Sequence, residues 1–313
     1  MTAYILKRLL ATIPVMVVVA LFVFLLLHLT PGDPAAVIAG DEATPAAIEG
    51  IRHKLGLDRP IWEQFGIYVQ NLLRGDLGTS IFSNLPVTTL VKQRLEPTVV
   101  LAIGTLLVAV LFAVPMGVLA AWKARTLVDR VVMGFSVLGF AVPVFLVGYV
   151  LIYIFAIELR WLPVQGYRPI SQGIGQTARS IVLPAFALGM VYMALIARVT
   201  RASMLEVLSQ DYIRTARAKG ASRTALLLHH ALKNAAVPIV TVIGIGLALL
   251  ISGVVITETV FNIPGLGRLT VDAILKRDYP IIQGLIIIFA GVKVLVNLMI
   301  DISYVFFDPR IRY

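Results

Sequence analysis

The sequence predicts an all-α protein that crosses a membrane six times. Of its 313 residues, 59% are hydrophobic and only 14% are charged, and the mean hydropathy is +0.92. A soluble core of ordinary proportions cannot bury so many apolar side chains. The apolar residues also gather in six runs, each near the ~20 residues that a helix needs to cross a hydrocarbon core of ~30 Å. These two observations indicate a polytopic membrane protein.

Each of the six runs is expected to form one transmembrane helix. No water satisfies backbone groups inside lipid, and the runs lack the alternation that a barrel strand would show. Pro143 lies within the third run and removes one backbone hydrogen bond, so we expect a kink there. In chain order the runs are Leu10–Leu29, Val99–Trp122, Val131–Ile157, Ile181–Ala197, Val237–Phe261 and Ile281–Phe306.

The first run could be mistaken for a cleaved signal peptide, because Lys7 and Arg8 precede it. It is about 20 residues long, however, and signal peptides carry apolar stretches of ~7–15 residues. Pro31-Gly-Asp-Pro34 follows it in place of a cleavage site with small residues. We therefore expect an uncleaved signal anchor.

The distribution of Lys and Arg predicts that both termini are cytoplasmic. Basic residues next to spans mark the cytoplasmic side of a membrane. Seven of them flank the first, second, third and sixth spans: Lys7, Arg8, Lys123, Arg125, Arg130, Arg310 and Arg312. Six others then fall on the outer side: Arg160, Arg168, Arg179, Arg268, Lys276 and Arg277. The reverse topology would place the seven flanking cations outside, together with the basic loop described next.

A polar loop at Asp211–Pro238 interrupts the apolar runs. Its basic residues are Arg214, Arg217, Lys219, Arg223 and Lys233, and Asp211 is its one acid. Helical spacing over Asp211–Lys219, followed by Gly220 and then Ser222, predicts a short helix, a left-handed turn and a second helix over about Arg223–Ala235.

Two interpretations of this helix–turn–helix elbow stay open. The small residues Ala216, Ala218 and Gly220 would let it approach a groove of another protein closely, and its arginines offer bidentate contacts to acidic groups. Alternatively, it is an inside loop with positive charge and helical propensity.

Composition and motifs argue against several other functions. The chain has no cysteine, which excludes disulfides, cysteine-based zinc sites and thiol chemistry. The four histidines, His28, His53, His229 and His230, are not spaced as one metal site, so we expect no metal. The formal charge of +10 belongs mostly to groups beside the spans, which suits lipid headgroups and not nucleic acid. No set of nucleophile, base and orienting group indicates an enzyme.

The segment Asp211–Gly220 resembles the cytoplasmic coupling motif of ABC-importer inner-membrane permeases, in which Glu-Ala-Ala is followed by three residues and Gly. Arg214-Thr215-Ala216 occupies the Glu-Ala-Ala place and Gly220 the glycine, a variant typical of the dipeptide, oligopeptide and nickel branch. Downstream the chain departs from the motif, because His230-Ala-Leu-Lys233 replaces Ile-x-Leu-Pro.

The resemblance covers essentially the whole chain. Further blocks similar to that family occur in the same order: Pro31-Gly-Asp-Pro34, Leu57-Asp58-x-Pro60, Gly75-Asp-Leu-Gly78-x-Ser80, Trp161-Leu-Pro163, Val260-Phe-x-x-Pro264-Gly-Leu-Gly267 and Asp308-Pro-Arg310. The resemblance implies the type I importer permease fold. It divides the chain into residues 1–30 (tail and first helix), 31–96 (external segment) and 97–313 (core of five helices with the coupling loop at 200–236).

The resemblance also implies a transport subunit of the bacterial inner membrane. It would pair with a second homologous permease, with two cytoplasmic ATP-binding subunits and with a periplasmic or lipid-anchored solute-binding protein. The chain has no Gly-Lys dipeptide and therefore no phosphate-binding loop of the P-loop kind, so ATP and Mg would be bound by the partners and no cofactor by this chain. The expected coupling residues are Asp211, Tyr212, Arg214, Thr215, Ala216, Arg217, Ala218, Lys219 and Gly220.

The implied substrate is a dipeptide, an oligopeptide or a related small peptide such as glutathione, and a nickel or metal chelate is the alternative within the family. Outside it, the alternatives are a secondary transporter, which would be expected to carry an internal repeat with broken helices, and an intramembrane enzyme. Neither an internal repeat nor a catalytic constellation is evident in the sequence.

Polar residues inside the spans are candidates for the translocation path or its gate. Lys293, Asn297 and Asp301 recur every four residues and form one stripe on the sixth helix; they line the path, or they bond to a neighbouring span or to the partner permease. Glu258, near the outer end of the fifth span, contributes to an external gate, meets a peptide's amino terminus or pairs with a Lys or Arg. Pro143 serves the path through its kink, or serves packing alone.

The external segment contains an amphipathic pattern. Ile61, Phe65, Tyr68 and Leu72 recur at helical spacing, which predicts a helix that lies on the membrane surface or packs over the spans. A structural cap and a docking surface for an external partner are both compatible with it.

Overall fold

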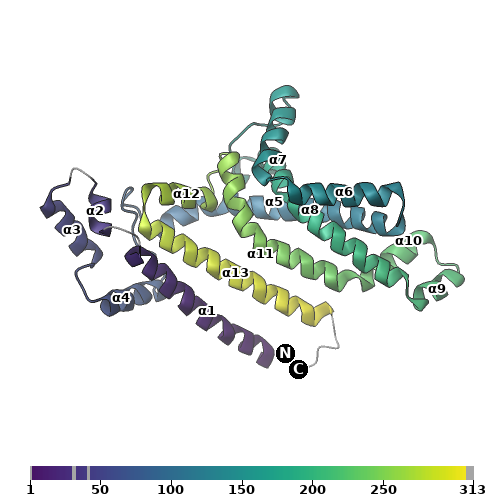
Figure 1. The fold of residues 1–313 in the computed structure, drawn as a ribbon, viewed down its shortest axis with the longest axis horizontal. Coiled ribbons are helices and arrows are strands. Elements are labelled where there is room, and N and C mark those ends of the chain that lie inside the picture. Colours follow the sequence, from purple (N-terminus) through teal and green to yellow (C-terminus); the bar gives the residue numbers. More distant parts are fainter. Residues whose placement is uncertain (1, 30–32, 41–42, 308–313) are drawn as a thin grey trace. The chain divides into compact units, whose positions relative to one another are not determined.

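The computed structural model describes residues 2–29, 33–40 and 43–307, and in this part of the chain every regular element is a helix (Figure 1). The predicted all-α class is confirmed. The elements are α1 (Thr2–Leu29), α2 (Pro34–Ala39), α3 (Pro45–Leu55), α4 (Ile61–Leu73), α5 (Val87–Trp122), α6 (Leu127–Ala141), α7 (Val144–Leu151), the π-helix η1 (Ile152–Glu158), the 3-10 helix η2 (Ile170–Gln172), α8 (Ile174–Leu208), α9 (Asp211–Ala218), α10 (Arg223–Ala225), the π-helix η3 (Leu226–Leu232), α11 (Ala236–Val260), α12 (Leu266–Lys276) and α13 (Tyr279–Phe307).

The candidate membrane spans agree with the six apolar runs. Four helical segments of the described chain are long and apolar enough to cross a membrane: Arg8–Leu26 of α1, all of α5, all of α8, and Tyr279–Ile300 of α13. Two bent pairs, α6 with the segment Val144–Glu158 and Arg223–Leu232 with Ala236–Leu250, bring the number to six if each pair is one span. The flanking Arg310 and Arg312, the Asp308–Arg310 block and the Pro31-Gly32 dipeptide lie outside the described residues.

The third run breaks where a kink was expected. Helix α6 ends at Ala141 and α7 begins at Val144, and the two helices of this pair are bent by 107°. Val142 is extended, with φ −89° and ψ 125°, because the ring of a proline disfavours helical backbone at the residue before it. Pro143 then precedes α7 with ψ 138°. The proline therefore separates two helices, and the prediction of one kinked helix was wrong.

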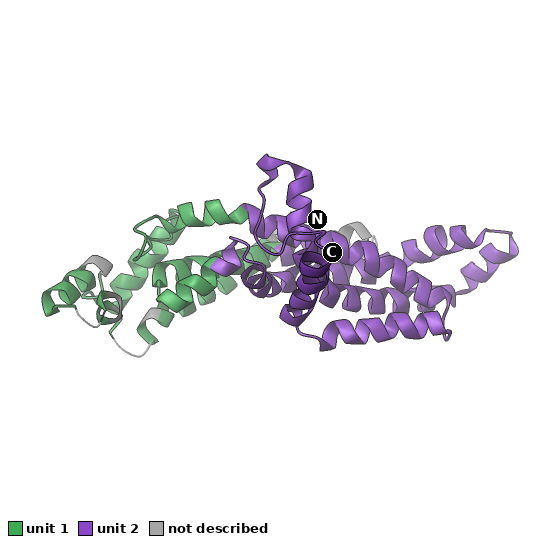
Figure 2. Cartoon of the chain, turned by 90° about the horizontal axis from the view of Figure 1, so that it is seen from above, with its two compact units in different colours: residues 1–95, 269–295 green, residues 96–268, 296–313 purple. Residues whose placement is uncertain are grey.

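The chain divides into two compact units (Figure 2). Unit 1 contains residues 1–95 and 269–295, and unit 2 contains residues 96–268 and 296–313. Helices α5, α12 and α13 contribute residues to both units.

Helix α8 is the central helix of unit 2. Of its spanning window, 72% is buried, compared with 17–22% for the other three single-helix spans. Leu188, Met193 and Ile196 are fully enclosed, and α6, α7 and α11 all contact α8. These side chains belong to one apolar core that also includes residues of α5, η1 and α11.

Small residues allow the helices to approach α8 closely. On α5, Thr105, Ala109, Ala113 and Gly117 are buried at intervals of four residues, which forms a narrow seam along one face. A Cβ atom added to Gly117 would lie 2.6 Å from Cβ of Thr200 and 2.7 Å from the carbonyl oxygen of Ala197. Lipid tails are as apolar as the helix surfaces, so no hydrophobic driving force brings spans together. Close packing of this kind holds them together instead.

The direction of the helices follows from the same contacts. Gly104 of α5 faces Ile181 and Gly117 faces Thr200, so α5 and α8 run parallel. Gly139 of α6 faces Met190, and Gly253 of α11 faces Leu188. The Gly139–Met190 contact and the Asp129–Arg201 pair make α6 antiparallel to α8. This alternation agrees with spans two and four crossing in one direction and span three in the other.

One ion pair joins α6 to α8 near the ends that the sequence places at the cytoplasm. The Asp129 carboxylate accepts hydrogen bonds from Nε and Nη2 of Arg201 at 2.5 and 2.7 Å, and its side chain is 6% exposed. It also accepts the backbone N–H of Arg125 at 2.9 Å. Asp129 thereby holds the α5–α6 turn, in which Arg125 has φ +65°.

In unit 1, the predicted amphipathic helix of the external segment is confirmed as α4. It packs on α1, where Phe24 lies with its ring centroid 5.3 Å from that of Phe65 and 5.7 Å from that of Tyr68. Nε2 of His28 lies 3.1 Å from Oε1 of Gln64. Burial raises the pKa of the Tyr68 hydroxyl to about 12.

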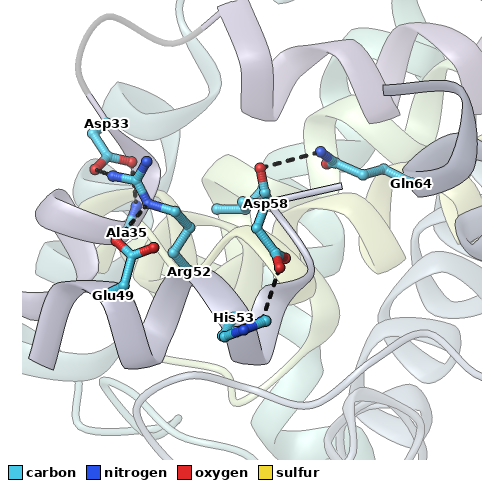
Figure 3. A network of polar contacts seen from close by, with 8 residues as sticks. Asp33, Ala35, Glu49, Arg52, His53, Asp58 and Gln64 are labelled. Atoms are coloured by element: carbon cyan, nitrogen blue, oxygen red, sulfur yellow. Dashed lines mark hydrogen bonds and ion pairs between the residues drawn. The ribbon is translucent and has the colours of Figure 1, made fainter. Parts of the chain in front are cut away.

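Polar contacts order the rest of the external segment. Arg52 pairs with Asp33 at 2.6 Å and with Glu49 at 3.4 Å, and His53 lies 2.9 Å from Asp58 (Figure 3). These contacts tie α2, α3 and the following loop together.

Buried Asp278 anchors the Gly75–Ser80 block. The Ser80 hydroxyl donates to the Asp278 carboxylate at 2.6 Å. Within unit 1, this hydrogen bond joins the external segment, which contains Ser80, to the turn before α13, which contains Asp278.

Replacing Gly117 by Ala is expected to destabilise the chain by about 1–3 kcal/mol, because the new methyl group overpacks the α5–α8 seam against backbone. Gly134→Ala is the matched control: nothing lies within 4 Å of its added Cβ atom, and alanine favours a helix by up to ~1 kcal/mol over glycine. Thermal unfolding in detergent measures both. Equal melting temperatures for the two variants would contradict the close approach of α5 to α8.

Asp129→Asn is expected to cost about 2–3 kcal/mol, because the half-buried Arg201 loses a charged hydrogen-bond acceptor. Chemical unfolding in detergent micelles measures this loss. The control is Asp211→Asn, which breaks a fully exposed pair with Arg214 and should leave the unfolding midpoint unchanged. A loss no larger than that of the control would show that the buried pair does not hold α6 to α8.

Candidate functional site

The loop singled out from the sequence folds as a helical elbow. Helix α9 spans Asp211–Ala218 and follows α8 after two residues. Asp211 lies in its first turn and Arg217 in its last turn. At these positions both charges interact favourably with the helix dipole and stabilise α9. Asp211 and Arg214 form an exposed ion pair at 3.3 Å, which contributes little to stability.

One face of α9 anchors the elbow to unit 2. Ile213 is 1% exposed, and Ala216, three residues later on the same face, packs against the same apolar cluster. The cluster contains Ala121, Met204, Ile213, Leu226, Ala231, Ala235 and Ile239. The elbow therefore rests on the end of α8 and on the helices that lead into α11.

The other expected coupling residues remain exposed: Asp211, Tyr212, Arg214, Thr215, Arg217, Ala218, Lys219 and Gly220. Of the three small residues, Ala216 packs inward, while Ala218 and Gly220 are exposed. The exposed face is consequently basic, with one aromatic side chain, Tyr212, that is 43% exposed.

The turn after α9 has the predicted geometry. Gly220 has φ +84°, in the region where glycine carries no Cβ penalty. Its N–H donates to the carbonyl of Arg217 at 3.0 Å, and the N–H of Ala221 donates to that of Ala216 at 3.2 Å, which is the Schellman pattern. Ser222 caps the next helix by accepting the N–H of Ala225 at 3.3 Å.

The second half of the elbow differs from a regular helix. Only α10 is α-helical before the π-helix η3 begins, and the chain then bends by 64° into α11. In a π-helix, hydrogen bonds join residues five apart. Leu226 and Ala231 are five apart, and both are buried in the cluster under α9. The π-turn thus keeps both side chains on the buried face, which α-helical periodicity alone did not predict.

Glu258 organises the turn after α11. It is fully buried and accepts the hydroxyl of Thr98 at 2.6 Å and the backbone N–H of Arg268 at 3.0 Å. Thr98 in turn accepts the N–H of Leu266 at 2.8 Å. A Cβ atom at Gly265 would collide with the Glu258 carboxyl group. The glycines of the Val260–Gly267 block therefore make room for this carboxylate.

The sequence did not reveal the contact between Thr98 and Glu258, because the two residues lie 160 positions apart along the chain. The position of Thr98 before an apolar run carries no motif. The glycine pair at Gly265 and Gly267 was visible in the sequence, but not the carboxylate against which both glycines pack.

The polar stripe of the sixth span lies on α13. Lys293 and Asn297 are exposed in this chain, whereas neighbouring Val296 is buried. Asp301 belongs to the same helix, but its side chain lies outside the described part. Pro143 lies at the break between α6 and α7, in unit 2.

Comparisons with known proteins agree with the resemblance seen in the motifs. Residues 113–313 match the family described as "Binding-protein-dependent transport system inner membrane component". Residues 1–102 match the family described as "Binding-prot-dependent transport system membrane comp, N-term". The elbow, Glu258 and the α13 stripe all lie within the first match.

Curated relatives match over the full length. The chain is 56% identical over 313 residues to the "Probable peptide ABC transporter permease protein y4tP" of Sinorhizobium fredii. It is 44% identical over 314 residues to the "Glutathione transport system permease protein GsiC" of Escherichia coli K12. In both comparisons 100% of each chain is covered.

A solved structure supports the fold. A chain of the MetNI methionine ABC transporter, solved in inward-facing conformations, is 16% identical with a TM-score of 0.59, and the match covers 71% of this chain and 97% of that one. The fold agrees with the family match and with the full-length relatives. These two matches show that this chain belongs to the family of inner-membrane components of binding-protein-dependent transport systems.

Proposed function

We propose that this multi-pass inner-membrane transport subunit translocates dipeptides, oligopeptides or a related small peptide such as glutathione, driven by ATP hydrolysis in partner subunits. The full-length relatives carry names that specify peptide and glutathione transport, which favours peptides over a metal chelate. In this proposal an external solute-binding protein delivers the substrate, and a second permease completes the path.

The observation that carries the proposal is the elbow. A short helix with one buried anchor, Ile213, and an exposed basic face, ended by a glycine with φ +84°, suits docking into a groove of another protein. Its arginines can form bidentate contacts to carboxylates. The ATPase subunits are the proposed partners, and they bind the ATP and Mg.

The packing of the elbow supports a mechanical role. Ile213 shares its apolar cluster with Met204 of α8 and Ile239 of α11. A displacement of α9 is therefore transmitted to two spans, because close-packed side chains transmit strain. In the proposed cycle, ATP binding draws the two elbows of the permease pair together and shifts the populations of inward- and outward-facing states.

The exposed stripe on α13 supports a second permease subunit. Ionisable groups within spans face a bundle interior or a watery cavity, not lipid. Lys293 and Asn297 are not covered by the described residues of this chain. A homologous subunit or the path between the two subunits would provide that environment.

Gly220→Val is expected to preserve membrane insertion and to lower ATP-driven peptide uptake, because a β-branched residue resists positive φ by roughly 1–2 kcal/mol. No atom lies within 4 Å of the added Cβ, so the effect is one of backbone conformation. Gly220→Asn is the matched control, since asparagine adopts this conformation more readily. Uptake and ATP hydrolysis in proteoliposomes measure the coupling, and equal uptake for the valine variant and the wild type would contradict the elbow.

Purification of the tagged chain in mild detergent is expected to recover a second permease and ATPase subunits. Replacing Arg214 and Arg217 together by Glu should reduce recovery of the ATPase, because the exposed face of α9 changes sign, while the second permease is retained. Mass spectrometry of the purified material measures both. A chain that transports alone, without an ATPase, would overturn the proposal in favour of a secondary transporter.

A further inference from the structure

Three of the arginines on the predicted outer side surround one pocket. Arg160, Arg168 and Arg179 line a cavity of about 550 Å³ in unit 2, between the end of η1 and the start of α8. Trp161, Tyr167 and Gln165 line it as well. Arginine is disfavoured beside spans on the outer side of a membrane, so the grouping of three of them around one cavity calls for a physical reason.

The lining of the pocket contains basic residues and no acidic ones. Within residues 2–29, 33–40 and 43–307, none of the three arginines forms an ion pair with a carboxylate. By contrast, Arg52, Arg201 and Arg214 each have a carboxylate partner. Like charges gathered in one concave site attract an anion.

Glu96 lies beside the pocket and offsets part of its positive charge, but it forms no ion pair with any of the three arginines within the described residues. Its carboxylate accepts the hydroxyl of Tyr167 and the N–H of Ile170, both at 2.8 Å. Burial and this neighbouring carboxylate raise the pKa of the Tyr167 hydroxyl. Tyr167 therefore stays neutral and adds no negative charge to the lining.

The walls of the pocket are held in place by several contacts. Arg179 donates from Nη2 to the carbonyl of Trp161 at 2.9 Å, and the N–H of Arg168 donates to Oγ of buried Ser180 at 3.3 Å. The N–H of Gly166 donates to the carbonyl of Phe261 at 2.9 Å. Leu162 and Tyr167 pack against the apolar core of unit 2.

Arg160 adopts a backbone conformation that is uncommon for its residue type. Its φ is +53°, a left-handed region that costs a residue with a side chain roughly 1–3 kcal/mol. The following residues are fixed by hydrogen bonds of the Trp161 and Leu162 N–H groups to the Phe155 carbonyl, at 2.9 and 3.3 Å. Such strain is retained where the surrounding structure imposes it, often at ligand clamps.

We propose that this arginine pocket binds the carboxylate group of a small solute. The volume lies in the range of ~300–1,000 Å³ typical of small-molecule sites, and guanidinium groups match carboxylates in a bidentate manner. Trp161, 60% exposed, offers an aromatic face beside the charge. If the proposed function holds, the ligand is the C-terminal carboxylate of a transported peptide. A protein surface would have to insert an acidic segment into this cavity, which favours a small solute.

The location of the pocket gives the bound carboxylate a mechanical consequence. Arg179 and Ser180 belong to the first turns of α8, and the elbow follows the end of the same helix at Leu208. A helix of 35 residues extends roughly 50 Å. A carboxylate that bridges Arg160 and Arg179 would therefore act on the outer end of the helix that carries α9.

The binding test uses the full chain in phosphatidylcholine nanodiscs, with Trp62 and Trp122 replaced by Phe so that Trp161 is the reporter. N-acetylalanine should change the Trp161 fluorescence saturably, and N-acetylalanine amide, which has no carboxylate, should not. Arg160→Gln and Arg168→Gln should each weaken binding about tenfold or more. Arg74→Gln, an exposed arginine of unit 1, should bind as the wild type does.

The same assay contains the outcomes that overturn the proposal. Equal affinity for the acid and the amide, or unchanged affinity in the Arg160 and Arg168 variants, would show that the pocket is not a carboxylate site. Inorganic phosphate binding more tightly than the acid would identify a phosphate site, and loss of N-acetylalanine binding in nanodiscs with phosphatidylglycerol would identify a lipid headgroup site. Thermal unfolding of each variant shows whether it is folded, and Arg160→Lys, which keeps the charge, should retain part of the affinity.

A separate uptake assay distinguishes this proposal from the proposed function. Proteoliposomes that contain the assembled transporter are supplied with a dipeptide or its C-terminal amide. Carboxylate binding without uptake of either peptide would contradict peptide import and leave the pocket standing. Wild-type rates of peptide uptake in the Arg160 and Arg168 variants, together with no N-acetylalanine binding by the wild-type chain, would overturn the pocket and leave peptide import standing.

Discussion

The close packing of α8 is the constraint on which the rest of unit 2 depends. No hydrophobic driving force acts between helices in lipid, so helices associate through van der Waals packing and hydrogen bonds. Gly117 of α5, Gly139 of α6 and Gly253 of α11 each bring a neighbouring helix against α8 where a Cβ atom would collide. The Asp129–Arg201 pair adds a polar contact between α6 and α8. Contacts with α8 thus position α5, α6 and α11.

The proposed arginine pocket and the elbow lie at the two ends of α8. The arginine pocket includes Arg179 in the first turns of α8, and the elbow rests on Met204 near its last turn. Because close-packed side chains transmit strain, α8 is the element that would connect the two sites in the proposed function. The elbow itself is held by one buried side chain, Ile213, which leaves its basic face free for contact with another protein.

Polar groups in this membrane protein fall into two kinds. Glu258 and Asp129 are enclosed and receive hydrogen bonds from named donors of the same chain, as buried charges require. Lys293 and Asn297 are exposed on α13. The first kind stabilises the turn after α11 and the contact of α6 with α8. In the proposed function, the second kind faces another subunit or the path.

The sequence by itself determined the helical class, the positions of the six apolar runs and the elbow, because these follow from apolar length, local periodicity and the special backbone of Gly220. It also determined the family, through motifs spread along the whole chain. The tertiary structure alone decided the break at Pro143 with its 107° bend and the π-turn that places Leu226 and Ala231 on one face. It likewise decided the pairing of Glu258 with Thr98 and the gathering of three arginines around one pocket. The proline at the break and the apolar residues of the π-turn were visible in the sequence, but how far the backbone would bend at these two places was not. The Glu258–Thr98 contact and the arginine pocket depend on residues far apart in the chain, and local patterns in a single sequence do not show which distant side chains will meet.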